Sequence, residues 1–418
     1  MIMQTYYDIA VVGAGPAGSS AAYYAAEGGL SVVLCDKAKF PRRKICGDAV
    51  TRRAQHHLER MGVLKPVLEA GEGRWSAVGG LVSPSGIRYI GDSKKHLGSS
   101  LVVSIKREIL DARLVRAAVE KGAEFREVFR VIDAVFDPAA ARWRIISDEG
   151  AEVFATVLVA ADGASSLLAR SLGLVERRAE AVCSSVYIKG GTHDFGCDGI
   201  VYYPDYLLPG YAALFREADG DLVFCTYIIP GGRAAPGDLK KLHHRVLTEY
   251  EPVASAIGPN ARIEDMKAAP LRLGGEKRTY GDHVLVVGDA AGHVDPLTGE
   301  GIQYALDAGQ IAAEVLRRAF DAKDFSADRL ARYQGEWMGS FGRDFAWSAR
   351  MAAVSAKRPV FLDAFASLSN RKGDRFMTRW GMIMTGSKPK SRFFLPGLSL
   401  PLAAEALRLK TRRKTALY

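Results

Sequence analysis

Three short apolar runs stand out along the chain, at residues 9–12, 157–161 and 284–287. Each run ends in glycine and small or acidic residues, and a helical pattern follows it. Uninterrupted apolar runs bounded by turn residues are typical of strands that are buried on both faces. The pattern therefore predicts an α/β fold in which buried strands run into tight turns.

The first run opens the stretch around which the chain is organised. It leads into Gly13-Ala14-Gly15-Pro16-Ala17-Gly18, a small-residue helix follows, Gly28-Gly29 end the helix, and residues 30–34 form a second apolar run. In such a β-α-β unit the glycines let the backbone approach a pyrophosphate, and the helix N-terminus offers unpaired N–H groups. Asp36 follows where a ribose hydroxyl needs an acceptor. The unit predicts a cofactor that contains ADP.

Along the rest of the chain, the spacing of apolar residues changes several times between the helical and the strand pattern. Helices are predicted at 51–61, with Thr51 as the cap, and at 104–119 and 303–320. Short strands are predicted within 78–104, in a hairpin made by 125–135 and 143–146, and at 184–188, 200–203, 212–215 and 222–229. An amphipathic helix is predicted at 239–257 and would pack on one face of the last group of strands. This half-exposed sheet is expected to cover the substrate.

These elements predict an α/β protein with a Rossmann-like domain for the ADP-containing cofactor, interleaved with a mixed-sheet substrate domain, and with a helical C-terminal region; the family resemblance described below makes the first an FAD-binding domain. The FAD-binding domain is expected at 1–75, 101–181 and 275–320, and the substrate-binding domain at 76–100 and 182–274. Residues 321–418 are expected to be helical and to end in a basic tail. A stripe of aromatic residues in this region is expected to pack in the core rather than to hold a cofactor: Tyr333, Trp337, Phe341, Phe345 and Trp347.

Composition is that of a globular protein, with 48% hydrophobic and 25% charged residues among 418. The charge is uneven: residues 371–418 hold twelve basic and two acidic residues, which equals the net charge of the whole chain, +10. An apolar stretch at 393–402 lies between the basic clusters and is too short to span a bilayer. This tail could bind an anionic membrane surface, or it could be a solvated charged tail. No nucleic-acid motif accompanies it.

Five scattered cysteines form no CxxC pair, so reduced thiols are expected and a metal site is not. The chain runs from Met1 straight into the first strand, which favours a cytoplasmic protein, peripheral on the membrane if the tail binds lipid. Cys46 stands in a Cys-Gly pair near the cofactor end, although an inert core thiol is the commoner role. Arg107 could reach a cofactor phosphate or be a solvated helix-start cation, and His293 is more often structural than a proton donor.

Taken together, the motifs resemble the flavoprotein monooxygenase superfamily, and more closely its geranylgeranyl reductase branch. The superfamily is indicated by the Gly13–Gly18 fingerprint, Ala161-Asp162-Gly163 and Gly288-Asp289-Ala290-Ala291. Lys44-Ile45-Cys46-Gly47-Asp48 and Pro296-Leu297-Thr298-Gly299-Glu300-Gly301-Ile302 are similar to signatures of the reductase branch. The resemblance covers about the first 320 residues.

The resemblance implies bound FAD, with Cys46 and Gly47 near the isoalloxazine, Arg107 and Asp289 holding the cofactor, and Gly301-Ile302 approaching the flavin ring. Cys46 is the one catalytic residue it suggests. The full set of expected FAD contacts is Gly13, Ala14, Gly15, Pro16, Ala17, Gly18, Asp36, Lys37, Lys44, Cys46, Gly47, Arg107, Val131, Asp162, Gly163, Gly288, Asp289, Pro296, Gly299, Gly301 and Ile302.

One stretch departs from the reductase pattern. Where the branch carries Tyr-x-Trp-x-Phe-Pro for the isoprenoid chain, this sequence reads Tyr211-Ala212-Ala213-Leu214-Phe215-Arg216, without the Trp and the Pro. Tyr211, Phe215 and Arg216 are the expected substrate contacts. A cation beside a lipid chain is costly, so Arg216 is expected to face solvent or a charged group of the substrate. The Trp-x-Trp-x-Ile-Pro stretch of flavin-dependent halogenases is absent.

The resemblance thus favours an FAD-dependent reductase that saturates C=C bonds of a polyprenyl chain, on a geranylgeranyl group or an isoprenoid quinone tail, by hydride transfer from reduced flavin. The alternative is a monooxygenase that hydroxylates an aromatic or protein-borne substrate. A silent flavoprotein that serves as a binding factor is a third class. Because no second nucleotide fingerprint is present, NAD(P)H or another reductant is expected to act only transiently.

Overall fold

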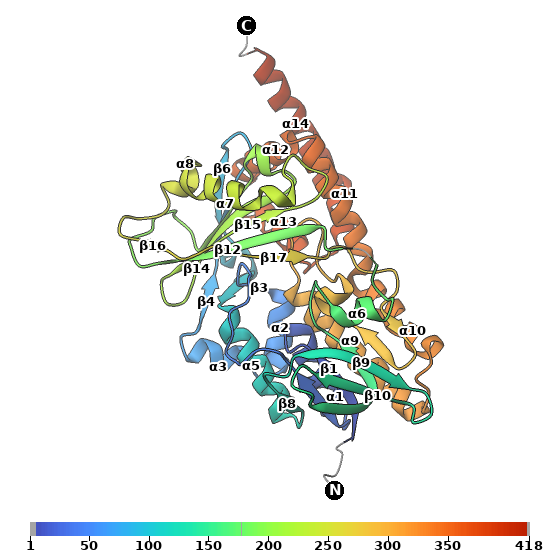
Figure 1. The fold of residues 1–418 in the computed structure, drawn as a ribbon. Coiled ribbons are helices and arrows are strands. Elements are labelled where there is room, and N and C mark those ends of the chain that lie inside the picture. The colour runs from blue at the N-terminus through green and yellow to red at the C-terminus, as the bar shows by residue number, and fades with distance from the viewer. Residues whose placement is uncertain (1–5, 177, 416–418) are drawn as a thin grey trace.

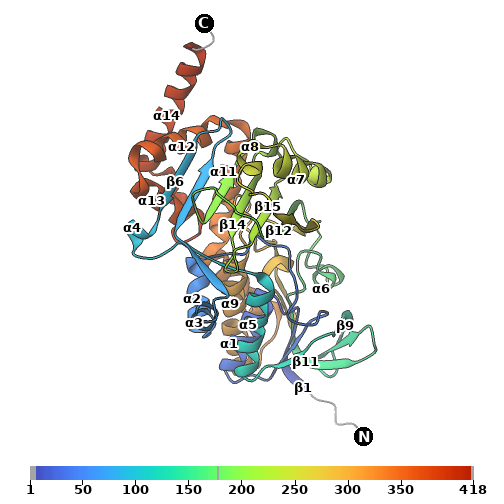
Figure 2. The same ribbon diagram turned by 90° about the vertical axis from the view of Figure 1, so that its left-hand side faces the viewer.

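The computed structural model describes residues 6–176 and 178–415. Figure 1 shows two sheets, one above the other, with the last helices of the chain running along one side and ending in a helix that projects past the body. The view in Figure 2 shows the same projection, so the helix does extend away from the two sheets. The α/β architecture with mixed sheets and a helical C-terminal region is the predicted one.

The first sheet carries the three predicted apolar runs in its centre. Its order is β18-β19-β11-β1-β2-β8, and β10 and β9 extend it antiparallel from β11. β1 is parallel to β2 and β11, and β11 is parallel to β19. The strands are β1 (Tyr6–Val12), β2 (Val32–Cys35), β8 (Glu124–Arg126), β9 (Val131–Asp137), β10 (Arg142–Ser147), β11 (Glu152–Ala160), β18 (Tyr280–Gly281) and β19 (Val284–Val286).

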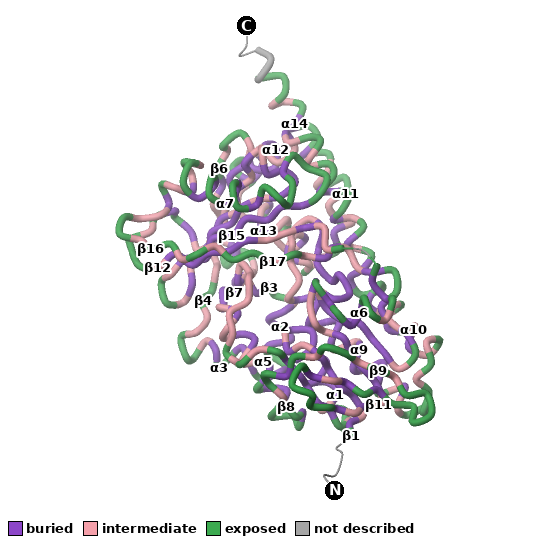
Figure 3. Tube along the Cα trace, viewed as in Figure 1, coloured by how far each residue is buried: buried purple, intermediate pink, exposed green. Residues whose placement is uncertain are grey.

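Helix α1 (Pro16–Glu27) is almost wholly buried and packs closely against α9 (Ile302–Ala322). Small residues allow the close approach: a Cβ on Gly309 would lie 2.6 Å from the carbonyl oxygen of Ala17. Ser20 Oγ donates a hydrogen bond to the Leu306 carbonyl at 2.7 Å. Figure 3 shows the buried chain concentrated here. The helices around this core are α2 (Arg52–Arg60), α3 (Leu64–Glu69), α5 (Arg107–Glu120), α6 (Leu167–Ser171) and α10 (Ala327–Trp337).

The second sheet joins segments from two parts of the chain. Its order is β16-β12-β15-β14-β13-β5-β6, with β17 on β12, and β13 pairs in parallel with β5. A third, small sheet has the order β3-β7-β4. The strands are β3 (Ala49–Thr51), β4 (Gly73–Ser76), β5 (Val78–Val82), β6 (Arg88–Asp92), β7 (Val102–Ile105), β12 (Ala181–Lys189), β13 (Gly199–Tyr202), β14 (Tyr211–Arg216), β15 (Leu222–Ile228), β16 (Arg262–Ile263) and β17 (Lys267–Leu271).

After α9 the chain is helical. Trp337, Phe341 and Phe345 are buried against α9, whereas Trp347 is only half-buried and packs on Phe394. The aromatic stripe is therefore core, as predicted, except at its last member. The elements are a π-helical turn (Met338–Gly342), α11 (Arg343–Lys357), α12 (Val360–Lys372), α13 (Asp374–Met384), a 3₁₀ turn (Lys390–Phe394) and α14 (Pro396–Thr415).

Three local predictions are wrong. The helix expected at 239–257 is two helices, α7 (Leu239–Thr248) and α8 (Glu251–Ala254), because Pro252 lacks the N–H that a continuous helix needs and begins a new one. The segment expected as one hairpin arm at 125–135 is split, since Phe125 belongs to β8 and pairs with Leu34 of β2. The Thr51 side chain does not cap α2, and its hydroxyl donates to Gln303 Oε1 instead.

Candidate active site

One cavity of about 1060 Å³ brings most of the predicted site together. Its walls come from the first sheet, the second sheet and α13. The predicted residues that line it are Gly13, Gly15, Pro16, Ala17, Asp36, Lys37, Lys44, Cys46, Gly47, Arg107, Val131, Asp162, Gly163, Tyr211, Phe215, Asp289, Gly299, Gly301 and Ile302. Residues more than 280 positions apart in the chain therefore line one cavity.

The fingerprint glycines serve two purposes. A Cβ on Gly13 would lie 2.3 Å from the carbonyl oxygen of Ala161, and one on Gly18 would lie 1.8 Å from that of Gly13, so both are required by strand and helix packing. A Cβ on Gly15 would meet only the Arg42 guanidinium, at 3.9 Å. Gly15 is also the N-cap of α1, and no side chain caps that helix. The backbone of Gly15 therefore faces the cavity. The N–H groups at the N-terminus of α1 are available to bind an anion there.

Asp36 lies at the end of β2 and is 8% exposed. One carboxylate oxygen accepts a hydrogen bond from the Ala14 N–H at 2.7 Å, and the other accepts from the Ala38 N–H at 2.8 Å. A carboxylate offers about four lone-pair sites, so acceptor capacity remains for a ribose hydroxyl. Lys37 and Val131 line the cavity as well.

Gly288 and Asp289 bring the third strand end to the same place. Gly288 has a φ of +64°, and a Cβ there would lie 2.6 Å from the Ala17 Cβ, so glycine lets this turn pack on α1. Asp289 lines the cavity, and no hydrogen bond to its carboxylate comes from the described residues. An open helix N-terminus, a glycine without side chain and two carboxylates along one cavity fit an elongated cofactor with a pyrophosphate and hydroxyl groups. The residues present therefore fit FAD.

Cys46 lines the cavity next to Arg107. Burial raises the pKa of the Cys46 thiol to about 11, although the Arg107 charge opposes the shift. Arg107 donates to both carboxylate oxygens of Asp111, at 2.8 and 2.9 Å, and Asp111 also pairs with Arg42 at 3.0 Å. Arg107 is thus a buried, paired cation rather than the solvated alternative. Burial also raises the pKa of Asp48 to about 7, while its hydrogen bond from Tyr187 opposes that change.

Five predicted residues do not line the cavity. Ala14, Gly18, Gly288 and Pro296 are buried behind the residues that do. The expectation for Arg216 is corrected, because neighbouring residues of a strand point to opposite faces and its side chain lies on the face away from Tyr211 and Phe215. Arg216 donates to the carbonyls of Cys197 and His193, at 3.2 and 2.8 Å, and stacks on Phe195. It faces neither the cavity nor a substrate charge.

Two further candidates have structural roles. The Asp162 carboxylate accepts from the N–H groups of Leu167 and Leu168 at the start of α6, at 2.8 and 3.2 Å, so only the rest of this residue is available to the cavity. His293 is fully buried and packs against Trp337, with ring centroids 4.6 Å apart. Burial lowers its pKa to about 3, which keeps it neutral. His293 does not line the cavity, in agreement with the structural role that the sequence favoured.

A mostly apolar wall of the cavity comes from the second sheet and α13, which also contributes Asp374 and Thr378, and sequence reasoning missed this wall. Leu81, Leu101 and Val201 line it from the second sheet and the segment before β7. Met377, Trp380 and Met384 line it from α13, together with Gly381. These α13 residues recur every three or four positions, which is a helix-face signal. Nothing in the sequence distinguishes this face from the other apolar helix faces of the C-terminal region.

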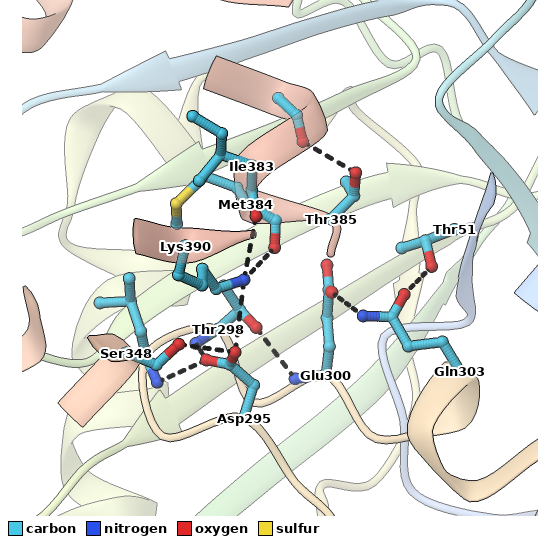
Figure 4. Close-up of polar contacts among 12 residues, drawn as sticks. Thr51, Asp295, Thr298, Glu300, Gln303, Ser348, Ile383, Met384, Thr385 and Lys390 are labelled. Carbon is cyan, nitrogen blue, oxygen red and sulfur yellow. Dashed lines mark hydrogen bonds and ion pairs between the residues drawn. The ribbon is translucent and has the colours of Figure 1, made fainter. Parts of the chain in front are cut away.

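A buried polar network fastens α13 to the cofactor loop at 295–301 (Figure 4). Lys390 Nζ donates to the carbonyls of Ile383 and Met384, at 3.1 and 2.8 Å, and lies 3.3 Å from the Asp295 carboxylate. Ser348 Oγ donates to Asp295 at 2.7 Å. Lys390 and Asp295 are both fully buried. Among the described residues, no group of three His, Cys, Asp or Glu side chains is arranged to hold a metal ion.

The comparisons with known proteins agree with this site. A family model described as FAD binding domain matches residues 6–334, and the chain belongs to this family. More narrowly, its relatives place it among the FAD-dependent oxidoreductases of the geranylgeranyl reductase and menaquinone reductase type. The recognition made from the motifs is confirmed at this level.

Three relatives cover most of the chain. It is 45% identical over 405 residues to conditioned medium factor receptor 1 of Dictyostelium discoideum, covering 94% of this chain and 79% of the relative. It is 31% identical over 358 residues to digeranylgeranylglycerophospholipid reductase 2 of Methanopyrus kandleri, covering 83% and 86%. It is 31% identical over 384 residues to menaquinone reductase of Mycolicibacterium smegmatis, covering 88% and 89%.

Among solved structures, a geranylgeranyl bacteriochlorophyll reductase-like protein of Thermoplasma acidophilum has the same fold. The TM-score is 0.77 at 20% identity, and the match covers 93% of this chain and 99% of that one.

Proposed function

We propose that the protein reduces C=C bonds of a polyprenyl chain, carried on a geranylgeranyl group or an isoprenoid quinone tail. The observation that carries this proposal is the apolar continuation of the cavity beyond the residues that fit FAD. Its lining of Leu, Val, Met and Trp side chains suits a flexible hydrocarbon, because such a chain gains affinity from the apolar surface it buries. The names of the two reductase relatives support the same substrate class.

The walls have separate tasks. FAD, once bound and reduced, supplies two electrons and one hydrogen to a C=C bond. Tyr211 and Phe215 place aromatic surface on the cavity wall, and the Tyr211 hydroxyl donates to the Thr298 carbonyl, which fixes its ring. The α13 side chains exclude water, which matters because an isolated alkene develops positive charge at a tertiary carbon before it is reduced. NAD(P)H or another diffusible reductant is the proposed source of the electrons.

Anaerobic turnover tests the function. Dithionite-reduced protein is mixed with a geranylgeranyl lipid or a menaquinone without oxygen, and the product is weighed by mass spectrometry. The proposal predicts a product heavier by two hydrogens per saturated bond. A product that forms only with oxygen and carries an oxygen atom from it would favour the monooxygenase. Bound FAD without turnover on either route would favour a silent binding factor.

We further propose that α14 attaches the protein to an anionic membrane surface. Leu400 and Leu407 are 67% and 68% exposed, and Lys410 and Arg412 continue the same exposed part of the helix beyond the body (Figures 1 and 2). Apolar side chains beside cations suit a helix that lies on lipid headgroups. In the described part of the chain, no helix has the length and apolarity that a bilayer span requires.

A further inference from the structure

Glu300 places a carboxyl group on the cavity wall, in the loop that joins the third strand end to α9. Backbone bonds hold this loop: the Asp295 N–H donates to the Glu300 carbonyl at 2.9 Å, and the Gly299 N–H donates to the Asp295 carbonyl at 2.9 Å. The Asp295 carboxylate accepts from the N–H groups of Leu297 and Thr298, at 2.8 and 3.0 Å. Glu300 therefore stands on a fixed support.

Within residues 6–176 and 178–415, the Glu300 side chain has one hydrogen bond and no ion pair. Its Oε2 accepts from Gln303 Nε2 at 3.0 Å, and Gln303 Oε1 accepts in turn from the Thr51 hydroxyl (Figure 4). The nearby cation, Lys390, is committed to Asp295 and to two helix carbonyls. The other carboxyl oxygen of Glu300 receives no hydrogen bond from the described residues. The hydrogen bond from Gln303 thus orients the carboxyl group, but no cation that the structure describes pairs with it.

This environment favours the protonated form. Burial raises the pKa of Glu300 to about 8, with the Asp295 charge adding to the shift and the Lys390 charge and the Gln303 hydrogen bond opposing it. Tyr304, the other titratable group beside it, stays neutral because burial raises its pKa far above neutrality. A carboxylic acid at neutral pH can give up a proton, and a donor works best when its pKa lies near the working pH.

The other acids of the cavity suit the task less well. The Cys46 thiol has its pKa raised to about 11 by burial. The Tyr211 hydroxyl already donates to the Thr298 carbonyl. Asp48, whose carboxylate accepts from Tyr187, does not line the cavity. Of Cys46, Tyr211, Asp48 and Glu300, it is Glu300 that both faces the cavity and has a carboxyl oxygen left over.

We propose that Glu300 is the catalytic acid that protonates the substrate alkene, an inference that rests on the proposed reductase function. One alkene carbon receives the proton from Glu300, and the other, the tertiary carbon, receives a hydride from reduced flavin. The π bond breaks, two C–H bonds form, and the flavin is left oxidised. The Glu300 carboxylate then takes a proton from water before the next turnover.

The test compares Glu300→Gln and Glu300→Asp with wild type and with the control Glu59→Gln, which changes an exposed glutamate of α2. Single-turnover reduction is followed anaerobically with dithionite-reduced protein and a geranylgeranyl lipid. Removing a general acid costs about 10²- to 10⁴-fold. We expect that loss for Glu300→Gln, partial activity for Glu300→Asp and no loss for the control. The wild-type rate should fall as pH rises through about 8, because the acid form is lost, and the Gln variant should lack this step.

A second readout does not depend on turnover. Infrared spectra of the purified protein at low and high pH should contain a protonated-carboxyl band that disappears with a midpoint near pH 8 and is missing from Glu300→Gln at every pH. If wild type reduces the lipid and Glu300→Gln is fully active, the proposed role of Glu300 is wrong and the reductase function stands. An unchanged carboxyl band in Glu300→Gln would have the same meaning. Wild type that reduces no C=C bond would overturn the reductase function and this inference with it.

Discussion

The cavity has two walls of different origin. The wall that fits FAD is built from backbone and short side chains at strand ends, where Gly13 and Gly288 hold conformations and approaches that a Cβ would prevent. The wall that α13 supplies is built from large apolar side chains and is fastened by one buried lysine, Lys390. The first wall depends on backbone geometry and the second on packing. A substitution in the first wall should therefore reduce flavin binding, whereas one in the second should reduce the free energy of unfolding.

Gly15→Val should separate the walls most sharply. The added side chain enters open cavity where the backbone faces the pyrophosphate site, so we expect flavin to be lost while the fold remains. Flavin absorbance after gel filtration and the urea midpoint measure the two effects. Gly237→Val is the control, since a Cβ at Gly237 meets nothing within 4 Å and the residue does not line the cavity. Full flavin content in Gly15→Val would contradict the assignment of this wall.

Lys390→Met should show the opposite pattern. The substitution leaves the Asp295 carboxylate buried without its cation, and breaking a buried pair in this way costs about 3–5 kcal/mol of unfolding free energy. Lys357→Met, at an exposed lysine of α11, should stay within about 0.5 kcal/mol of wild type. Urea denaturation followed by tryptophan fluorescence gives both values. Equal stability of the two variants would mean that the lysine does not fasten α13.

The Lys410→Gln and Arg412→Gln double variant tests the outer end of the C-terminal region. Each basic group near an anionic surface contributes about 1 kcal/mol, so binding to vesicles with phosphatidylserine should weaken about 30-fold at low salt. Flavin content and stability should not change, because both side chains are exposed. Sedimentation with vesicles measures the binding. Equal binding of variant and wild type, or no binding by wild type, would remove the membrane proposal.

Cys46→Ser should have the smallest effect. It tests whether the thiol contributes to the reaction in the cavity that the two walls form. The thiol lines the cavity beside Arg107, so we expect the rate of substrate reduction to change about tenfold while the unfolding free energy moves by less than about 1 kcal/mol. Stopped-flow reoxidation of the flavin and urea denaturation supply the two numbers. Loss of stability with an unchanged rate is the pattern of an inert core cysteine.

Most residues that the motifs predicted as cofactor contacts line one cavity, because a dinucleotide site needs particular residues at particular spacings. Asp36 and Asp289 follow buried strands, so their positions could be derived from the pattern alone. Arg216 was misplaced although the signal was available: Tyr211 and Phe215 are four residues apart on one strand and share a face, and the next residue must point away. The division of the chain into domains at the predicted residues stays a prediction.

The α13 wall could not be predicted, because any apolar helix face can serve as core. What assigns Trp380 and Met384 to the cavity is the docking of the C-terminal region on the second sheet, a long-range effect without local signature. Lys390 illustrates the same limit. In sequence it was one of twelve basic residues in a tail, and only its pairing with Asp295 distinguishes it from the exposed ones.

The account depends most on the two walls enclosing one space in which flavin and a polyprenyl chain meet. The direct measurement is the flavin absorption spectrum of the FAD-loaded protein during titration with a geranylgeranyl lipid. We predict a saturable spectral change in wild type and in Val354→Trp, an exposed site on α11, and a lost or much weaker change in Val201→Trp, whose added ring fills the apolar part of the cavity. All three proteins should hold the same amount of flavin. No spectral change in wild type, or an equal change in Val201→Trp, would contradict the account.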